Sequence, residues 1–81
     1  MRLCVKLFAV AKELAGRDEL LVDLPPGATV AELQAHVTAE YPALKNILSH
    51  ALWAVDTNYA TPDTSLNESS NIALIPPVSG G

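Results

Sequence analysis

The chain has 81 residues and a net charge of −4, with 49% apolar and 17% charged residues. This length allows one hydrophobic core, and the composition excludes a disordered chain. The basic residues are few and scattered, and no apolar run approaches the roughly 20 residues of a membrane-spanning helix. We therefore expect neither nucleic acid nor a membrane as a partner. The basic residues are Arg2, Lys6, Lys12, Arg17 and Lys45.

Cys4 is the only cysteine of the chain, so an internal disulfide is impossible. A lone cysteine is typical of a reducing compartment. The first residues lack the basic region, apolar stretch and cleavage site of a secretory leader. These features predict a soluble, cytoplasmic protein.

Residues 2–8 alternate strictly between two faces, which predicts a half-buried strand. Leu3, Val5 and Leu7 share the face expected to meet the core. Phe8 falls on the opposite face, together with Cys4. This strand would present an aromatic side chain away from the core.

A short helix is predicted over Val10–Ala15 because the segment contains good helix formers and Gly16 follows as a stop. Alternation over Leu20–Leu24 then predicts a second strand. Pro25-Pro26-Gly27 ends that strand sharply.

The main helix has the clearest start signal in the chain. Thr29 is followed three residues later by Glu32, the spacing of a capping box. The apolar residues after Thr29 recur with helical spacing and predict an amphipathic helix that ends near Pro42. That stripe consists of Val30, Leu33, Val37 and Tyr41.

The second half of the chain predicts short elements. We expect a helical turn and loop over Ala43–His50, a strand over Ala51–Val55, and a turn leading into Tyr59-Ala60. The apolar run Ile72–Ile75 predicts a last strand covered on both faces, ended by Pro76-Pro77. The order of elements predicts an α+β roll with a mixed sheet of about five strands and one main amphipathic helix.

Conventional catalytic groups are not assembled by any motif in the sequence. His36 and His50 have no Cys or paired carboxylate at metal-ligand spacing, so we predict no metal site and interpret both as solvated residues. Cys4 could in principle carry sulfur as a thiolate. Only Arg2 and Lys6, on its own strand face, would lower the pKa of that thiol, so a bystander role is favoured.

The C-terminal segment carries the strongest functional signal. Val78-Ser79-Gly80-Gly81 follows the proline pair with little side-chain bulk. Glycine loses the most conformational entropy on ordering, so a Gly-Gly pair is a poor end for a structural strand. It suits a chain end that enters a narrow site and presents its carboxylate. A frayed end is the alternative interpretation.

The sequence resembles the small subunit of molybdopterin synthase, a family of ubiquitin-like sulfur carriers. The resemblance rests on residues 5–16, on Pro26–Leu33 at the helix start and on Ile72–Gly81 at the C-terminus. It implies a β-grasp domain over residues 1–77 and an extended Gly-Gly tail over 78–81.

The resemblance further implies a cycle in which an E1-like enzyme uses ATP to adenylate Gly81. A sulfur donor, supplied by a desulfurase, then converts the adenylate to a thiocarboxylate. The large subunit would use this sulfur to build the dithiolene of molybdopterin from cyclic pyranopterin monophosphate. On this reading the chain binds no cofactor, donates sulfur without catalytic side chains of its own, and threads Gly80, Ser79, Val78 and Pro77 into its partner.

The family implies that Phe8, Tyr59 and Ile75 are docking residues. For Phe8 a core position is the alternative, and Ile75 could be shared between core and interface. The chain departs from the family at Asp56, where asparagine is usual, and at Asn67–Asn71, which lacks the usual glycine.

Two other classes of function stay open at this point. The chain could carry sulfur for another pathway, such as thiamine synthesis or tRNA thiolation. It could also be a ubiquitin-like protein modifier or a simple binding module, in which the C-terminus forms an isopeptide bond or does nothing. Pro76-Pro77-Val78-Ser79 before the glycines favours the molybdopterin reading.

Overall fold

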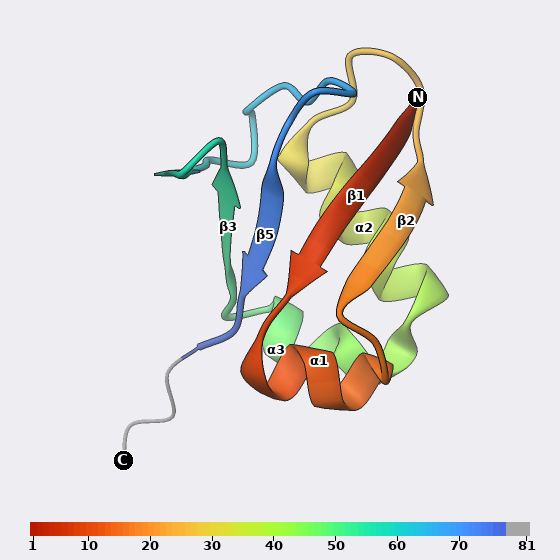
Figure 1. The fold of residues 1–81 in the computed structure, drawn as a ribbon, viewed down its shortest axis with the longest axis vertical. Helices are drawn as coiled ribbons and strands as arrows, with labels where there is room; N and C mark the ends of the chain where they lie inside the picture. The colour runs from red at the N-terminus through yellow and green to blue at the C-terminus, as the bar shows by residue number, and fades with distance from the viewer. Residues whose placement is uncertain (78–81) are drawn as a thin grey trace.

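The computed structural model describes residues 1–77, so the predictions for Val78, Ser79, Gly80 and Gly81 lie outside the described part. Within it, a mixed five-stranded sheet has the strand order β2-β1-β5-β3-β4 (Figure 1). The strands are β1 (Arg2–Leu7), β2 (Glu19–Asp23), β3 (Leu52–Val55), β4 (Asn58–Tyr59) and β5 (Ile72–Ile75). The helices are α1 (Ala9–Ala15), α2 (Val30–Glu40), the 3₁₀ turn η1 (Pro42–Leu44) and α3 (Lys45–Leu48).

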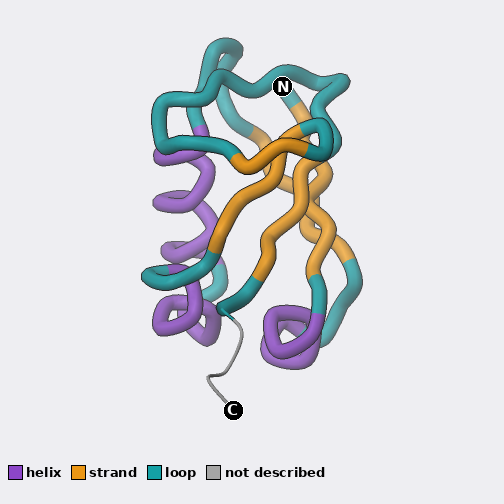
Figure 2. Tube along the Cα trace, turned by 90° about the vertical axis from the view of Figure 1, so that its left-hand side faces the viewer, coloured by secondary structure: helices purple, strands orange, loops and turns teal. Residues whose placement is uncertain are grey.

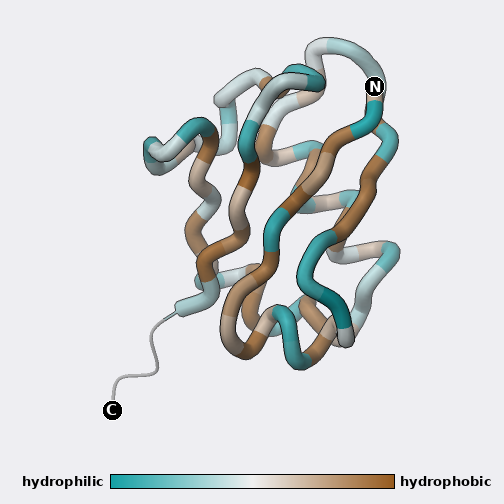
Figure 3. The backbone as a smooth tube through the Cα atoms, in the orientation of Figure 1, coloured by the Kyte–Doolittle hydropathy of each residue, from teal (hydrophilic) through white to brown (hydrophobic). Residues whose placement is uncertain are grey.

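The first strand lies inside the sheet and pairs on both sides. β1 runs antiparallel to β2 and parallel to β5. Its alternation places Leu3, Val5 and Leu7 in the core, as predicted. Figure 3 shows polar and apolar segments succeeding one another along this strand. Period two therefore separates a core face from an open face.

The predicted helix starts and stops are largely confirmed. Gly16 ends α1 with φ 71, the left-handed conformation that glycine adopts without a Cβ clash. Thr29 Oγ1 accepts a hydrogen bond from the Glu32 N–H at the start of α2 over 3.4 Å. The Glu32 carboxylate, however, lies 3.5 Å from the Thr29 hydroxyl, and no bond from it to the Thr29 backbone N–H is present among the described residues.

One face of the sheet is covered by α2, while no helix of the described residues 1–77 runs along the other (Figure 2). The stripe predicted for α2 is buried at Val30, Leu33 and Val37. Tyr41 is the residue after the helix and is only partly buried. Leu44 of η1 and Leu48 of α3, the two elements that follow α2 in the chain, are also buried in the core. Each such fully buried aliphatic side chain contributes about 1.5–3 kcal/mol relative to exposure.

The turn between β3 and β4 uses left-handed backbone. Asp56 and Thr57 have φ values of 51° and 70°, which matches a two-residue hairpin turn. Asp56 also exchanges two hydrogen bonds of 2.9 Å with Asn71, through its N–H and through its carboxylate. These bonds tie the hairpin turn to the start of β5. The departure at Asp56 thus has a structural role.

The prediction that β5 is covered on both faces is wrong. Ile72 and Leu74 are buried, but Ala73 and Ile75 are only half-buried. Both neighbours of β5 are strands, so the strand is central in the sheet without being covered above and below. The run Ile72–Ile75 is apolar throughout because the side of the sheet that α2 does not cover also carries apolar residues. Among the described helices, none is long and apolar enough to cross a membrane.

Candidate functional site

The open face of the sheet carries most of the large exposed apolar side chains. Register pairs place Tyr59 beside Ala54, Ala54 beside Ala73, and Ala73 beside Lys6. A second row pairs Leu52 with Ile75. Paired residues in a sheet project from the same face. We call this surface the open face; its apolar members are Phe8, Leu21, Leu52, Ala54, Tyr59, Ala73 and Ile75.

Phe8 is not a core residue, because 49% of it is exposed. It lies one residue beyond β1 and precedes α1, with extended backbone angles of −132° and 155°. This extended conformation continues the alternation of β1 by one residue. The aromatic ring therefore belongs to the open face, as its position in the pattern predicts.

The other two expected docking residues lie on the same face. Tyr59 on β4 is 72% exposed, and Ile75 on β5 is half-buried. The half-burial of Ile75 agrees with a residue shared between core and surface. Their docking role itself stays a prediction, but the fold brings both to one surface with Phe8.

Sequence reasoning missed Leu52 and Leu21, which are 53% and 60% exposed on the open face. Leu52 is the register partner of Ile75, and Leu21 is that of Cys4. Alternation alone could have found Leu52, since its neighbour Trp53 is the buried residue of that strand. Both leucines therefore belong to the open face.

The described part of the chain ends at Pro77, at one end of this face. Pro76 is buried and Pro77 is exposed. Neither proline has an N–H, so β5 cannot extend its ladder through them toward β1 or β3. The described chain therefore leaves the sheet at Pro77, two residues after the apolar pair of Leu52 and Ile75.

Comparison with known proteins shows to which family the chain belongs. The sequence matches the ThiS family over residues 5–81, nearly the whole chain. The chain belongs to the ThiS family. Among relatives, it is 34% identical over 83 residues to the molybdopterin synthase sulfur carrier subunit of Chlamydomonas reinhardtii, and the alignment covers 100% of both chains.

Solved structures share the fold of this ThiS-family chain and confirm the predicted β-grasp. Small archaeal modifier protein 1 from Haloferax volcanii superposes with a TM-score of 0.86 at 28% identity, covering 100% of both chains. A chain in the complex of subunits 1 and 2 of the molybdopterin-converting factor from Helicobacter pylori gives a TM-score of 0.71 at 26% identity, again over 100% of both chains.

Cys4 in this ThiS-family chain contacts a carboxylate on the neighbouring strand. Its thiol donates a hydrogen bond of 2.6 Å to the Glu19 carboxylate. That bond raises the pKa of Cys4, with burial and the Glu19 charge adding to the rise and Lys6 opposing it. The lowering effect of Lys6 on this pKa is therefore outweighed. A higher pKa leaves less reactive thiolate at neutral pH.

The two histidines were predicted to be solvated, and both are at least partly exposed. His36 on α2 pairs with Glu40 one turn later, at 2.8 Å, and His50 is an exposed residue. Within residues 1–77, no cluster of three His, Cys, Asp or Glu side chains has the geometry to hold a metal ion.

Proposed function

We propose that this chain is the sulfur carrier subunit of a molybdopterin synthase and that Gly81 is the group that carries the sulfur. The observation that carries this proposal is full-length similarity to a molybdopterin synthase sulfur carrier subunit, in a chain ending Gly80-Gly81. The exit of the chain at Pro77, beside an apolar face, supports it. A partner bound to that face would lie next to Pro77, so that the following residues could enter the partner.

The chemistry proposed for Gly81 proceeds in two steps. Its carboxylate attacks the α-phosphorus of ATP on an E1-like enzyme, forming an acyl-adenylate and releasing pyrophosphate. The terminal sulfur of a persulfide donor, charged by a desulfurase, then attacks the acyl carbon and expels AMP. A second thiol of the donor system reduces the resulting acyl disulfide, which leaves a thiocarboxylate on Gly81 and a disulfide between the two thiols. ATP belongs to the activating enzyme, and this chain holds no cofactor. The lone cysteine fits a reducing, cytoplasmic setting.

The large synthase subunit is the proposed acceptor of this sulfur. The Helicobacter pylori chain of the same fold is found in a complex of subunits 1 and 2, which supports an equivalent pairing here. Exposed aromatic side chains often anchor such interfaces. Phe8, Tyr59 and Ile75, with Leu52 added by the fold, would contact the large subunit while Val78–Gly81 enters it to deliver sulfur to cyclic pyranopterin monophosphate.

Three tail variants test the proposal. Gly81→Ala adds a Cβ beside the reacting carbonyl, Gly80→Val adds a branched side chain, and one extra residue after Gly81 displaces the carboxylate. Misplacing a reacting group by about 1 Å can cost ~10²-fold in rate. We expect each variant to lose ATP–pyrophosphate exchange or single-turnover sulfur transfer by that order, with little change in thermal stability. Near-normal rates for the extended chain would overturn the proposal.

A protein modifier is the second candidate, because the fold superposes closely on small archaeal modifier protein 1. In that case the adenylate would pass to a lysine amine and form an isopeptide bond. Incubation with the activating enzyme, ATP and a cell extract would then yield covalent adducts that survive reduction. The sulfur carrier proposal predicts a thiocarboxylate and transfer to the pyranopterin in their place.

A further inference from the structure

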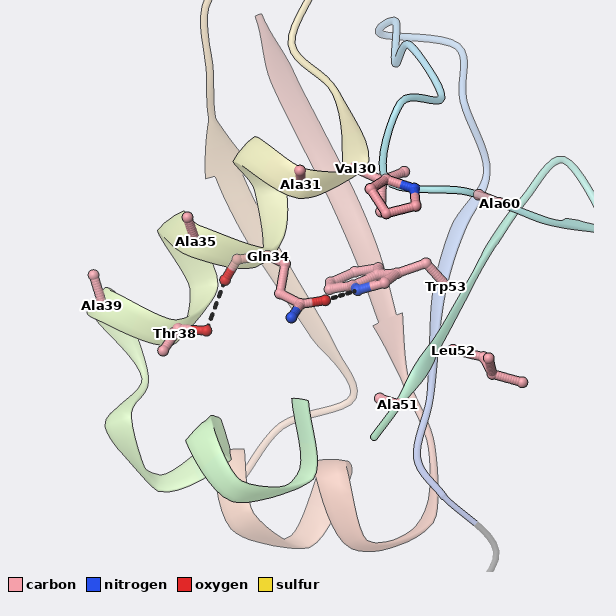
Figure 4. A pocket seen from close by; sticks show the side chains of 11 residues that line it. Val30, Ala31, Gln34, Ala35, Thr38, Ala39, Ala51, Leu52, Trp53 and Ala60 are labelled. Carbon is pink, nitrogen blue, oxygen red and sulfur yellow. Dashed lines mark hydrogen bonds between the residues drawn. The ribbon is translucent and has the colours of Figure 1, made fainter. Parts of the chain in front are cut away.

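A groove of about 670 Å³ lies between α2 and β3 (Figure 4). Three alanines of α2, spaced four residues apart, form one wall, and the indole of Trp53 contributes to the other. Residues four apart share a helix face, and alanine leaves that face shallow. The groove is therefore a consequence of small side chains at Ala31, Ala35 and Ala39.

A polar group is fixed inside this apolar groove. The Trp53 indole N–H donates to the Gln34 side-chain oxygen over 2.8 Å. Because indole is only a donor, the bond sets the orientation of the Gln34 amide. The amide NH₂ consequently points away from the indole, as Figure 4 shows. It offers hydrogen-bond donors to a carbonyl oxygen of a chain lying in the groove.

Two exposed acidic residues flank the groove wall in sequence. Glu32 follows Ala31, and Asp63 follows Pro62. The helix α2 contains no Lys or Arg, and its His36 is paired with Glu40. Charge complementarity therefore favours an occupant that carries Lys or Arg.

The groove also continues the open face around the edge of β3. Leu52 borders the groove and is at the same time the register partner of Ile75 on the open face. A protein seated on the open face would meet the mouth of the groove at this residue. This continuity favours the docked subunit as the source of the occupant.

We propose that a segment of the large subunit, apolar and carrying Lys or Arg, wraps around β3 and lies in the groove between α2 and β3. This inference rests on the proposed function, because the open face must dock that subunit first. The segment would bury apolar side chains against Trp53 and the alanine stripe and accept a hydrogen bond from Gln34. The groove thus adds a second contact, on the covered side of the sheet.

Binding of the large subunit to matched variants tests this proposal. Ala35→Arg fills the groove and adds a charge of the wrong sign, while Ala43→Arg makes the same change at an exposed residue of η1. We expect Ala35→Arg to weaken binding roughly tenfold or more, as losing an interface anchor does. Ala43→Arg should leave affinity nearly unchanged, and circular dichroism should show both variants folded.

The outcomes separate the groove from the docking face. If Phe8→Ala weakens binding and Ala35→Arg does not, the groove proposal is overturned and the proposed function stands. If wild-type protein fails to bind the large subunit, both are overturned. A second measurement needs no amino-acid substitution. The protein has a single tryptophan, so it can be labelled with 5-fluorotryptophan, and the fluorine resonance should shift on complex formation. An unshifted resonance in the saturated complex would contradict occupation of the groove.

Discussion

Ile75 of β5 and Leu52 of β3 are register partners on the open face, two residues before the described chain ends at Pro77. Leu52 is half-exposed because the next residue of its strand, Trp53, points to the opposite face and is buried. The pair thus lies between Pro77 and the rest of the apolar surface that includes Phe8. If the tail enters a partner, these residues are placed to contact the same partner.

Truncating the open face should weaken docking without unfolding the domain. We expect Phe8→Ala and Leu52→Ala each to reduce the binding free energy for the large subunit by ~2 kcal/mol or more, because buried aromatic and aliphatic anchors dominate interfaces. Leu14→Ala, an exposed leucine of α1 outside the sheet, is the matched control. Isothermal titration calorimetry measures the difference. Equal losses in all three variants would contradict a face-specific interface.

Removing the hydrogen-bond partner of Trp53 should destabilise the fold. Gln34→Ala leaves the buried indole N–H without its acceptor, and an unsatisfied buried donor costs about 1–3 kcal/mol. Gln34→Glu keeps an acceptor oxygen in place and should recover most of that loss. Urea denaturation followed by circular dichroism measures both. A Gln34→Ala variant as stable as wild type would show that water replaces the bond at no cost.

Relieving the left-handed turn should stabilise the protein. Thr57 is β-branched and has φ 70°, a conformation in which glycine is preferred. Thr57→Gly should therefore raise the free energy of unfolding by about 0.5–1 kcal/mol, since the relief exceeds the entropic cost of glycine. Ala35→Gly, inside α2, should lower it by about 1 kcal/mol. The same direction of change at both sites would contradict the strain at Thr57.

The reactivity of Cys4 should follow its carboxylate neighbour. The Glu19 hydrogen bond is the largest cause of the raised pKa of Cys4, so Glu19→Ala should move that pKa down and shift the alkylation profile to lower pH. Lys6 acts in the opposite direction, so Lys6→Ala should shift the profile to higher pH. Rates of iodoacetamide modification against pH measure both. Unchanged profiles would mean that the thiol does not contact Glu19 in solution.

Local patterns in the sequence predicted much of the fold. Alternation placed Leu3, Val5 and Leu7 in the core, and the Thr29 cap located the start of α2, because these signals depend on neighbours in the chain. The open side of β5 could not be read from Ile72–Ile75, since an apolar run looks the same whether one or both faces are covered. Strand pairing across the sheet decides that point.

Some residues of the candidate site could also be predicted from local patterns, and others could not. Phe8 was assigned to the open face from the period of its strand alone. Leu52 was missed although alternation with Trp53 within its own strand predicts its exposure. The bond between Trp53 and Gln34 was missed because it joins a strand to a helix across 19 residues of sequence. The hydrogen bond that raises the pKa of Cys4 was missed for the same reason. Glu19 is 15 residues away in sequence and reaches the thiol only through the pairing of β1 with β2.

The most direct test of the sulfur carrier proposal is the position of the sulfur after activation. The protein should be incubated with the activating enzyme, ATP and the sulfur donor and then analysed by intact and tandem mass spectrometry under non-reducing conditions. The proposal predicts replacement of one oxygen by sulfur at Gly81, both in wild-type protein and in Cys4→Ala. Sulfur added at Cys4, with Gly81 unmodified and transfer lost in Cys4→Ala, would contradict it.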